Sequence, residues 1–81
     1  MLQAKTVRFL NNLAAYRTRA GLTQEKAAVD LGFPRSRLSL WEGGRELPAW
    51  DVARKFMAFY QVTLEELYPS LEARNLIARP E

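Results

Sequence analysis

Apolar side chains recur every three or four residues along most of the chain, which is the period of an amphipathic helix. The first such run, in which an arginine shares the apolar stripe, comprises Val7, Leu10, Leu13, Ala14 and Arg17. Gly21 follows this run and offers the left-handed residue that often ends a helix. The pattern therefore predicts a first helix from about Thr6 to Ala20.

Two short helices are expected next, because capping residues and glycines divide the chain at close intervals. Thr23 is a good N-cap for a second helix, and Gly32 is its C-terminal stop. Pro34 fixes φ at the start of a third helix over residues 35–42, which a glycine pair ends. About three residues around Gly32 join the two helices, and this spacing with its glycine is typical of a helix-turn-helix.

The rest of the pattern predicts further helices, so the expected fold class is all-α. The longest apolar run follows Pro48 and predicts the most buried helix: Trp50, Val52, Ala53, Phe56, Met57, Phe59 and Tyr60. Thr63 and Glu66 form a capping box for a short helix that Pro69 closes. The tail from Ser70 to about Ala78 either forms one more helix or frays. A chain of 81 residues is expected to be a single domain, with its core at about 6–68.

Composition argues against catalysis and metal binding. The chain has no cysteine and no histidine, which removes disulfides, the usual zinc ligands and any Ser-His or Cys-His pair. Glu25 and Asp30 share a predicted helix but lie about 140° apart around it, so they do not converge as a carboxylate pair. We therefore expect no enzyme activity, no metal and no cofactor.

The charge pattern points to a polyanionic partner. Residues 1–41 contain seven Lys/Arg against two Asp/Glu, whereas residues 42–81 contain five against seven. Nucleic acid is the commonest polyanion inside cells, and a merely solvated basic surface is the alternative. No apolar run approaches the roughly 20 residues that cross a bilayer, and the N-terminus lacks the apolar block of a signal peptide. We expect a soluble, cytoplasmic protein with no membrane partner.

The predicted 35–42 helix has an apolar side and a small polar side. At about 100° per residue, Leu38 and Trp41 share one face, and Trp41 is assigned with Phe33 to the core. The opposite arc and its two shoulders comprise Ser36, Ser39, Leu40, Gly43, Arg35 and Arg37. Small residues let a helix approach base edges, and flanking arginines can reach guanine or phosphate oxygens. This arc is a candidate DNA-reading surface, with an ordinary solvated helix face as the alternative.

Four residues on or beside this candidate surface need separate interpretation. Leu40 either touches a thymine methyl group or makes a rim contact with a neighbouring element. Gln24 lies in the first turn of the second helix, where free N–H groups and the helix dipole favour a phosphate, whereas Thr23 is better explained as a cap. Arg45 is suited to a backbone phosphate, and a surface arginine without a partner is the alternative.

Several motifs occur here in a recognisable order. They are GLTQ at 21–24, an Ala-Ala helix ending LGF at 31–33, a helix ending WEGG at 41–44, R..P at 45–48 and VTLEELY at 62–68. The chain resembles the lambda repressor and Cro (Cro/C1-type) family of helix-turn-helix DNA-binding domains, the Xre-like regulators, over about Leu10 to Tyr68. This resemblance implies a compact bundle of five helices whose third helix enters the major groove, with two subunits reading a pseudo-palindromic operator.

The resemblance also assigns roles to individual residues. It implies groove contacts at Arg35, Ser36 and Leu40, with Ser39 nearby. It places Gln24 as a phosphate contact that also braces the third helix, and it pairs Arg17 with Glu42. The pair makes independent sense, because an unpaired Arg17 on the apolar stripe of its helix would be costly.

Three positions depart from the family pattern. Pro34 replaces a Ser or Thr cap, Gly43 lacks the polar side chain that often meets a phosphate, and Gln61 stands where a helix-ending glycine is common. The bases that are read do not follow from the resemblance, because a one-residue shift of the third helix would exchange the roles of its first three residues.

Together these observations predict a sequence-specific regulator that binds double-stranded DNA, a homodimeric repressor that occupies its operator. Its predicted DNA contacts are Thr23, Gln24, Arg35, Ser36, Arg37, Ser39, Leu40 and Arg45. One alternative is an antitoxin-type regulator that also binds a partner protein through a surface such as the 69–81 tail. Another is a protein-interaction module on the same fold. The dimer surface could be the end of the fourth and fifth helices, the tail, or residues 1–5.

Overall fold

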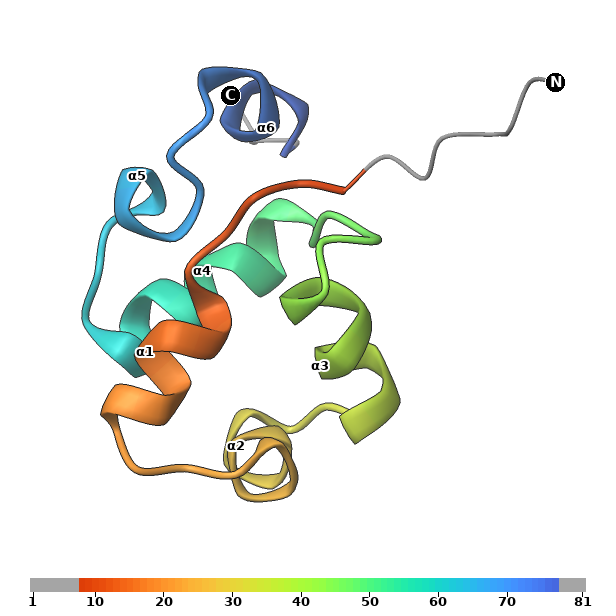
Figure 1. Cartoon of the computed structure of the whole chain (residues 1–81), viewed down its shortest axis with the longest axis vertical. Coiled ribbons are helices and arrows are strands. Elements are labelled where there is room, and N and C mark those ends of the chain that lie inside the picture. The colour runs from red at the N-terminus through yellow and green to blue at the C-terminus, as the bar shows by residue number, and fades with distance from the viewer. Residues whose placement is uncertain (1–7, 78–81) are drawn as a thin grey trace, which may run out of the picture.

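The computed structural model describes residues 8–77 and folds them into six α-helices without a strand, which confirms the all-α prediction. The helices are α1 (Leu13–Arg19), α2 (Gln24–Leu31), α3 (Arg35–Glu42), α4 (Trp50–Tyr60), α5 (Leu64–Leu67) and α6 (Leu71–Leu76). Figure 1 shows α5 and α6 toward one end of the bundle, α2 at the other end, and α1, α4 and α3 between them. Among the helices between residues 8 and 77, none has the length and apolar character that a bilayer crossing requires.

Local capping explains where the short helices begin and end. The Thr23 side chain accepts a hydrogen bond from the backbone N–H three residues later, and Gly32 ends α2 with a left-handed φ of 84°. Thr63 and Glu66 form a complete capping box at α5. Gln61 ends α4 with a φ of 56°, the conformation that glycine adopts at lower cost.

The first helix is shorter than the sequence pattern predicted. It begins at Leu13, and residues 8–12 are not helical. The prediction of a helix from about Thr6 is therefore wrong over these five residues. Leu10, expected on the inner stripe of that helix, is 80% exposed. Thr6 and Val7 lie outside the described residues.

Tertiary backbone hydrogen bonds explain why residues 8–12 leave the helical pattern. The N–H of Phe9 donates to the Gly44 carbonyl at 2.8 Å, and the N–H of Asn12 donates to the Leu67 carbonyl at 2.9 Å. These bonds tie the segment to the loop after α3 and to the end of α5. They satisfy donors that a helix would otherwise have used, so periodicity alone gives the wrong start.

The core lies between the helices and is built from all six of them. Its buried members are Leu13, Ala27, Ala28, Leu31, Leu38, Trp41, Ala53, Phe56, Leu64, Leu67, Tyr68, Ala73 and Ile77. The assignment of Phe33 and Trp41 to the core is confirmed, since Trp41 is buried and Phe33 packs against it with ring centroids 5.0 Å apart.

The C-terminal segment forms a sixth helix that packs onto the others. The Ser70 side chain caps α6, and Ala73 and Ile77 point into the core. Arg74 Nη1 donates to the Tyr68 and Pro69 carbonyls, at 2.8 Å each. Of the two outcomes left open for the tail, the described part therefore takes the helical one.

Candidate nucleic-acid interface

Helices α2 and α3 form the helix-turn-helix unit that the glycine spacing predicted. A turn of three residues joins them, and its backbone is fixed because the N–H groups of Gly32 and Phe33 both donate to the Ala28 carbonyl, at 2.8 and 2.9 Å. Pro34 begins α3 with a φ of −62° and a ψ of 143°, without a side-chain cap. The departure from a Ser or Thr cap therefore leaves the helix start intact.

The inner side of α3 is held by large apolar groups. Leu38 is fully buried and Trp41 is 5% exposed. The Trp41 ring also meets Phe56 of α4 edge to face, with centroids 5.6 Å apart. Since this packing fixes the rotation of α3 about its own axis, it also determines which residues face outward.

The opposite side of α3 is open to solvent. We call it the α3 outer face, and it comprises Arg35, Ser36, Ser39 and Leu40, all exposed. The two serines and Arg35 line a shallow hollow. A neighbouring hollow between the start of α2 and the start of α3 is lined by Arg17, Thr23, Gln24, Glu25 and Arg35. The surface therefore combines small side chains with long cationic ones.

A buried polar network sets the position of α3 against α1 and α2. Arg17 Nε donates to Glu42 Oε2 at 2.7 Å, and Arg17 Nη1 donates to the Leu22 carbonyl at 2.8 Å. Gln24 Nε2 donates to Glu42 Oε1 at 2.9 Å. Both Glu42 oxygens are thus bonded, which offsets the cost of burying this carboxylate to 5% exposure. The network links one residue of each of the three helices.

Two arginines of α3 have exposed acidic partners. Arg37 Nη1 donates to both oxygens of Glu46, at 2.9 and 2.7 Å. Arg35 Nη1 lies 3.7 Å from Glu25 Oε1, a longer and more exposed pair. Arg45 is exposed, and over residues 8–77 no side chain bonds its guanidinium. The three arginines that the sequence predicted to contact DNA therefore differ in how closely an acidic side chain engages each guanidinium.

The loop after α3 is anchored by contacts that the sequence did not predict. Gly44 has a φ of 73°, and a Cβ there would lie 2.4 Å from the Phe9 carbonyl oxygen, so only glycine fits. Asn11 Nδ2 donates to the Trp41 and Glu42 carbonyls, at 3.1 and 3.3 Å, and satisfies the end of α3. The one available signal was the Asn-Asn pair before Leu13, since asparagine favours the start of a helix.

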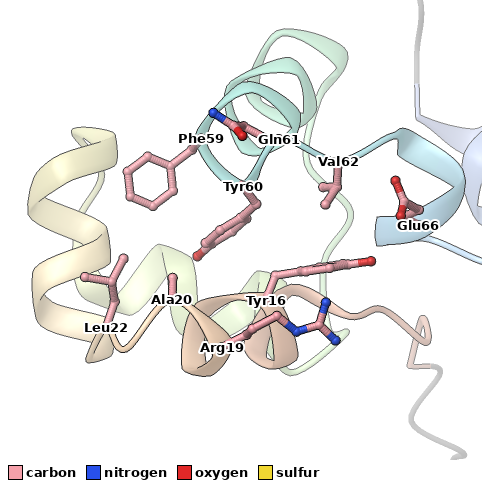
Figure 2. A pocket seen from close by; sticks show the side chains of 9 residues that line it. All are labelled: Tyr16, Arg19, Ala20, Leu22, Phe59, Tyr60, Gln61, Val62 and Glu66. Carbon is pink, nitrogen blue, oxygen red and sulfur yellow. The ribbon is translucent and has the colours of Figure 1, made fainter.

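A separate hollow opens between α1 and the end of α4, and no residue of α3 lines it. Figure 2 shows Tyr16, Arg19, Phe59, Tyr60 and Glu66 around it. Burial, reinforced by the negative Glu42 and opposed by the positive Arg17, raises the pKa of Tyr60 to about 12. Burial also raises the pKa of the Tyr68 phenol. Both rings thus remain neutral well above pH 7.

The described residues contain no assembled metal site. Over residues 8–77, no three Cys, His, Asp or Glu side chains gather closely enough to hold a metal ion. The acidic groups nearest to α3 are instead engaged with arginines or glutamine, as the Glu42 and Glu46 contacts show. The polar groups that the helices around α3 present are therefore mainly guanidinium and amide groups.

Comparison with known proteins gives two matches. Residues 8–68 match the model of a protein family described as a helix-turn-helix domain. The chain is also 34% identical over 68 residues to the "HTH-type transcriptional activator BcrR" of Enterococcus faecalis. That alignment covers 84% of this chain and 33% of the relative, so the chain spans about a third of that protein's length.

Proposed function

The chain belongs to the helix-turn-helix domain family, and we propose that it is a transcriptional regulator that binds double-stranded DNA in a sequence-specific way. One observation is the main support for this function: the α3 outer face presents two small serines and Arg35 to solvent, while Leu38 and Trp41 hold the other side of α3 in the core. A bare helical face with a flanking cation suits the major groove.

The contacts follow from the positions on this surface. Arg35, Ser36, Ser39 and Leu40 would approach base edges, since they share the α3 outer face. Thr23, Gln24, Arg37 and Arg45 lie beside it and would bind phosphates. The amide of Gln24 already bonds Glu42, so a phosphate contact there would tie the backbone of DNA to the buried network.

We further propose that two copies of the chain bind a pseudo-palindromic operator. In helix-turn-helix dimers the two recognition helices enter successive major grooves about 34 Å apart. The chain would act as a single domain, and occupancy of the operator would repress transcription by obstructing polymerase. Activation is the second candidate for the regulatory effect, favoured by the similarity to the E. faecalis relative, which is named as a transcriptional activator.

Two other functions use the same fold. An antitoxin-type regulator would also bind a partner protein through a surface that includes α6, where Leu71 and Leu76 are 63% and 57% exposed. A protein-interaction module would have lost DNA binding altogether. Neither alternative requires the exposed serines and arginine on α3.

Selection of binding sites from a random duplex library, at stated salt concentrations, tests the proposed function. We expect enrichment of a sequence with two-fold symmetry and binding that weakens as salt rises. A library that yields no enriched sequence, together with no anisotropy change on any duplex at low salt, would favour the protein-interaction module. An enriched but asymmetric site would contradict the dimer.

A further inference from the structure

We propose that Glu46 restrains Arg37 and thereby lowers the affinity of this protein for non-specific DNA. In this role Glu46 is a positioning residue, because it acts through the guanidinium of Arg37. The role rests on the proposed DNA-binding function and concerns how the same surface discriminates between DNA sequences.

The geometry places the Arg37 guanidinium beside the loop after α3. Its Nη1 bonds both carboxylate oxygens of Glu46, at 2.9 and 2.7 Å, and its Cζ lies 6.0 Å from the centroid of the Trp41 ring. Both partners keep access to solvent, with side-chain exposures of 48% and 40%. Arg37 is therefore held in a defined orientation at the edge of the α3 outer face, where a phosphate could still reach it.

The position of Glu46 is fixed by the loop that holds it. The Arg45 N–H donates to the Leu40 carbonyl and the Gly44 N–H to the Trp41 carbonyl, both at 3.1 Å. The Gly44 carbonyl in turn accepts from Phe9 at 2.8 Å. The backbone that leads into Glu46 is therefore fixed before DNA arrives, which keeps its carboxylate within reach of Arg37.

This arrangement weakens phosphate binding in two ways. A phosphate that approaches Arg37 competes with a carboxylate that already accepts from Nη1, and the same carboxylate repels the phosphate. Non-specific complexes depend almost wholly on phosphate contacts, so they are weakened most. A specific complex also has base contacts from the α3 outer face, so the ratio of specific to non-specific affinity rises.

Titration of a random duplex against the wild type and Glu46→Gln, by fluorescence anisotropy over a series of salt concentrations, tests this role. We expect Glu46→Gln to bind the random duplex roughly five- to ten-fold more tightly near 0.1 M salt and to steepen the salt slope by about 0.9, as one added phosphate contact does. Glu65→Gln on α5 is the matched control, since it changes the net charge equally at an exposed site. We expect it to change the affinity less than about two-fold.

A double-mutant cycle separates restraint of Arg37 from general repulsion. In an Arg37→Ala background, Glu46→Gln should change random-duplex affinity by less than about two-fold. Equal gains for Glu46→Gln and Glu65→Gln, or a full gain without Arg37, would overturn this role of Glu46 and leave the DNA-binding function standing. If the wild type binds no duplex at any salt concentration, both proposals fail together.

Discussion

Two ion pairs made by residues of α3 have the same shortest N–O distance and differ in burial. Arg17–Glu42 and Arg37–Glu46 each have an N–O distance of 2.7 Å. The side chains of the first pair are 15% and 5% exposed, whereas those of the second are 48% and 40% exposed. The first pair lies among three helices, and the second lies at the edge of the α3 outer face.

The difference separates a structural role from a functional one. Removing one partner of a buried pair leaves an uncompensated charge in the protein, so such a pair fixes the position of the elements that it joins. An exposed pair adds little to stability, since water replaces either partner at small cost. Distance alone does not distinguish the two, and burial does. Arg37, in the exposed pair, is the arginine that we propose exchanges its partner for a DNA phosphate.

The largest effect is expected from breaking the buried pair. Glu42→Ala leaves Arg17 without its carboxylate and Gln24 without its acceptor, so the free energy of unfolding should fall by about 3 kcal/mol in urea denaturation. Glu65→Ala, at an exposed site, should stay within about 0.5 kcal/mol of wild type. Replacing both partners, by Arg17→Met with Glu42→Leu, should recover part of the loss. A Glu42→Ala protein as stable as wild type would contradict the structural role.

The next effect concerns the loop that presents the exposed pair. Gly44→Ala introduces a Cβ that would meet the Phe9 carbonyl oxygen at 2.4 Å, at a φ of 73°. We expect a loss of about 2 kcal/mol in thermal or urea unfolding, from strain and the displaced backbone. Gly43→Ala is the control, since Gly43 has a φ of −74° and an α-helical ψ and its added Cβ would come no closer than 3.2 Å to its nearest neighbour, the Ser39 carbonyl oxygen. Equal losses at both glycines would mean that the Phe9 contact does not anchor the loop.

A smaller effect is expected at the α3 outer face, on binding and not on stability. Arg35→Ala should weaken binding to the selected operator by about 1 to 3 kcal/mol and relax the preference at one base pair. Its unfolding curve should match wild type within about 0.5 kcal/mol, because its partner Glu25 is exposed. Operator and random duplexes should be titrated in parallel. Equal weakening on both duplexes would mean that Arg35 contacts a phosphate and not a base.

The smallest effect is expected at Arg45, an exposed arginine whose guanidinium bonds no side chain between residues 8 and 77. Arg45→Ala should weaken operator and random duplexes alike, by about 1 kcal/mol, and flatten the salt slope by about 0.9. The slope of log affinity against log salt concentration is the measurement. An unchanged slope would place this side chain outside the DNA interface.

Local signals in the sequence were sufficient for most helices. The capping residues act through hydrogen bonds to groups only a few positions away, so a short stretch of sequence is enough to recognise them. They are Thr23, Gly32 and the pair of Thr63 and Glu66. The periodicity of α3 also assigned Leu38 and Trp41 to the core for the same reason. Which side of α3 faces solvent was therefore predictable before any coordinates.

The features that sequence missed depend on contacts between distant residues. Residues 8–12 leave the helical pattern because they bond the backbone near Gly44 and Leu67, and no local pattern contains that information. Glu46 meets Arg37 across a loop and follows it by nine positions in the sequence. The sequence predicted Arg37 as a DNA contact without indicating that an acidic side chain already occupies it. Competition of this kind becomes visible only in three dimensions.

The match to the helix-turn-helix family ends at Tyr68, but the hydrophobic interior does not. Ala73 and Ile77 complete it, and Arg74 holds the intervening turn by bonding two carbonyls. A chain cut after Tyr68 would lose Ala73 and Ile77, which are 1% and 2% exposed. Anyone who transplants this unit into a fusion protein should therefore take α6 with it, because the folded core extends past the match to the family model.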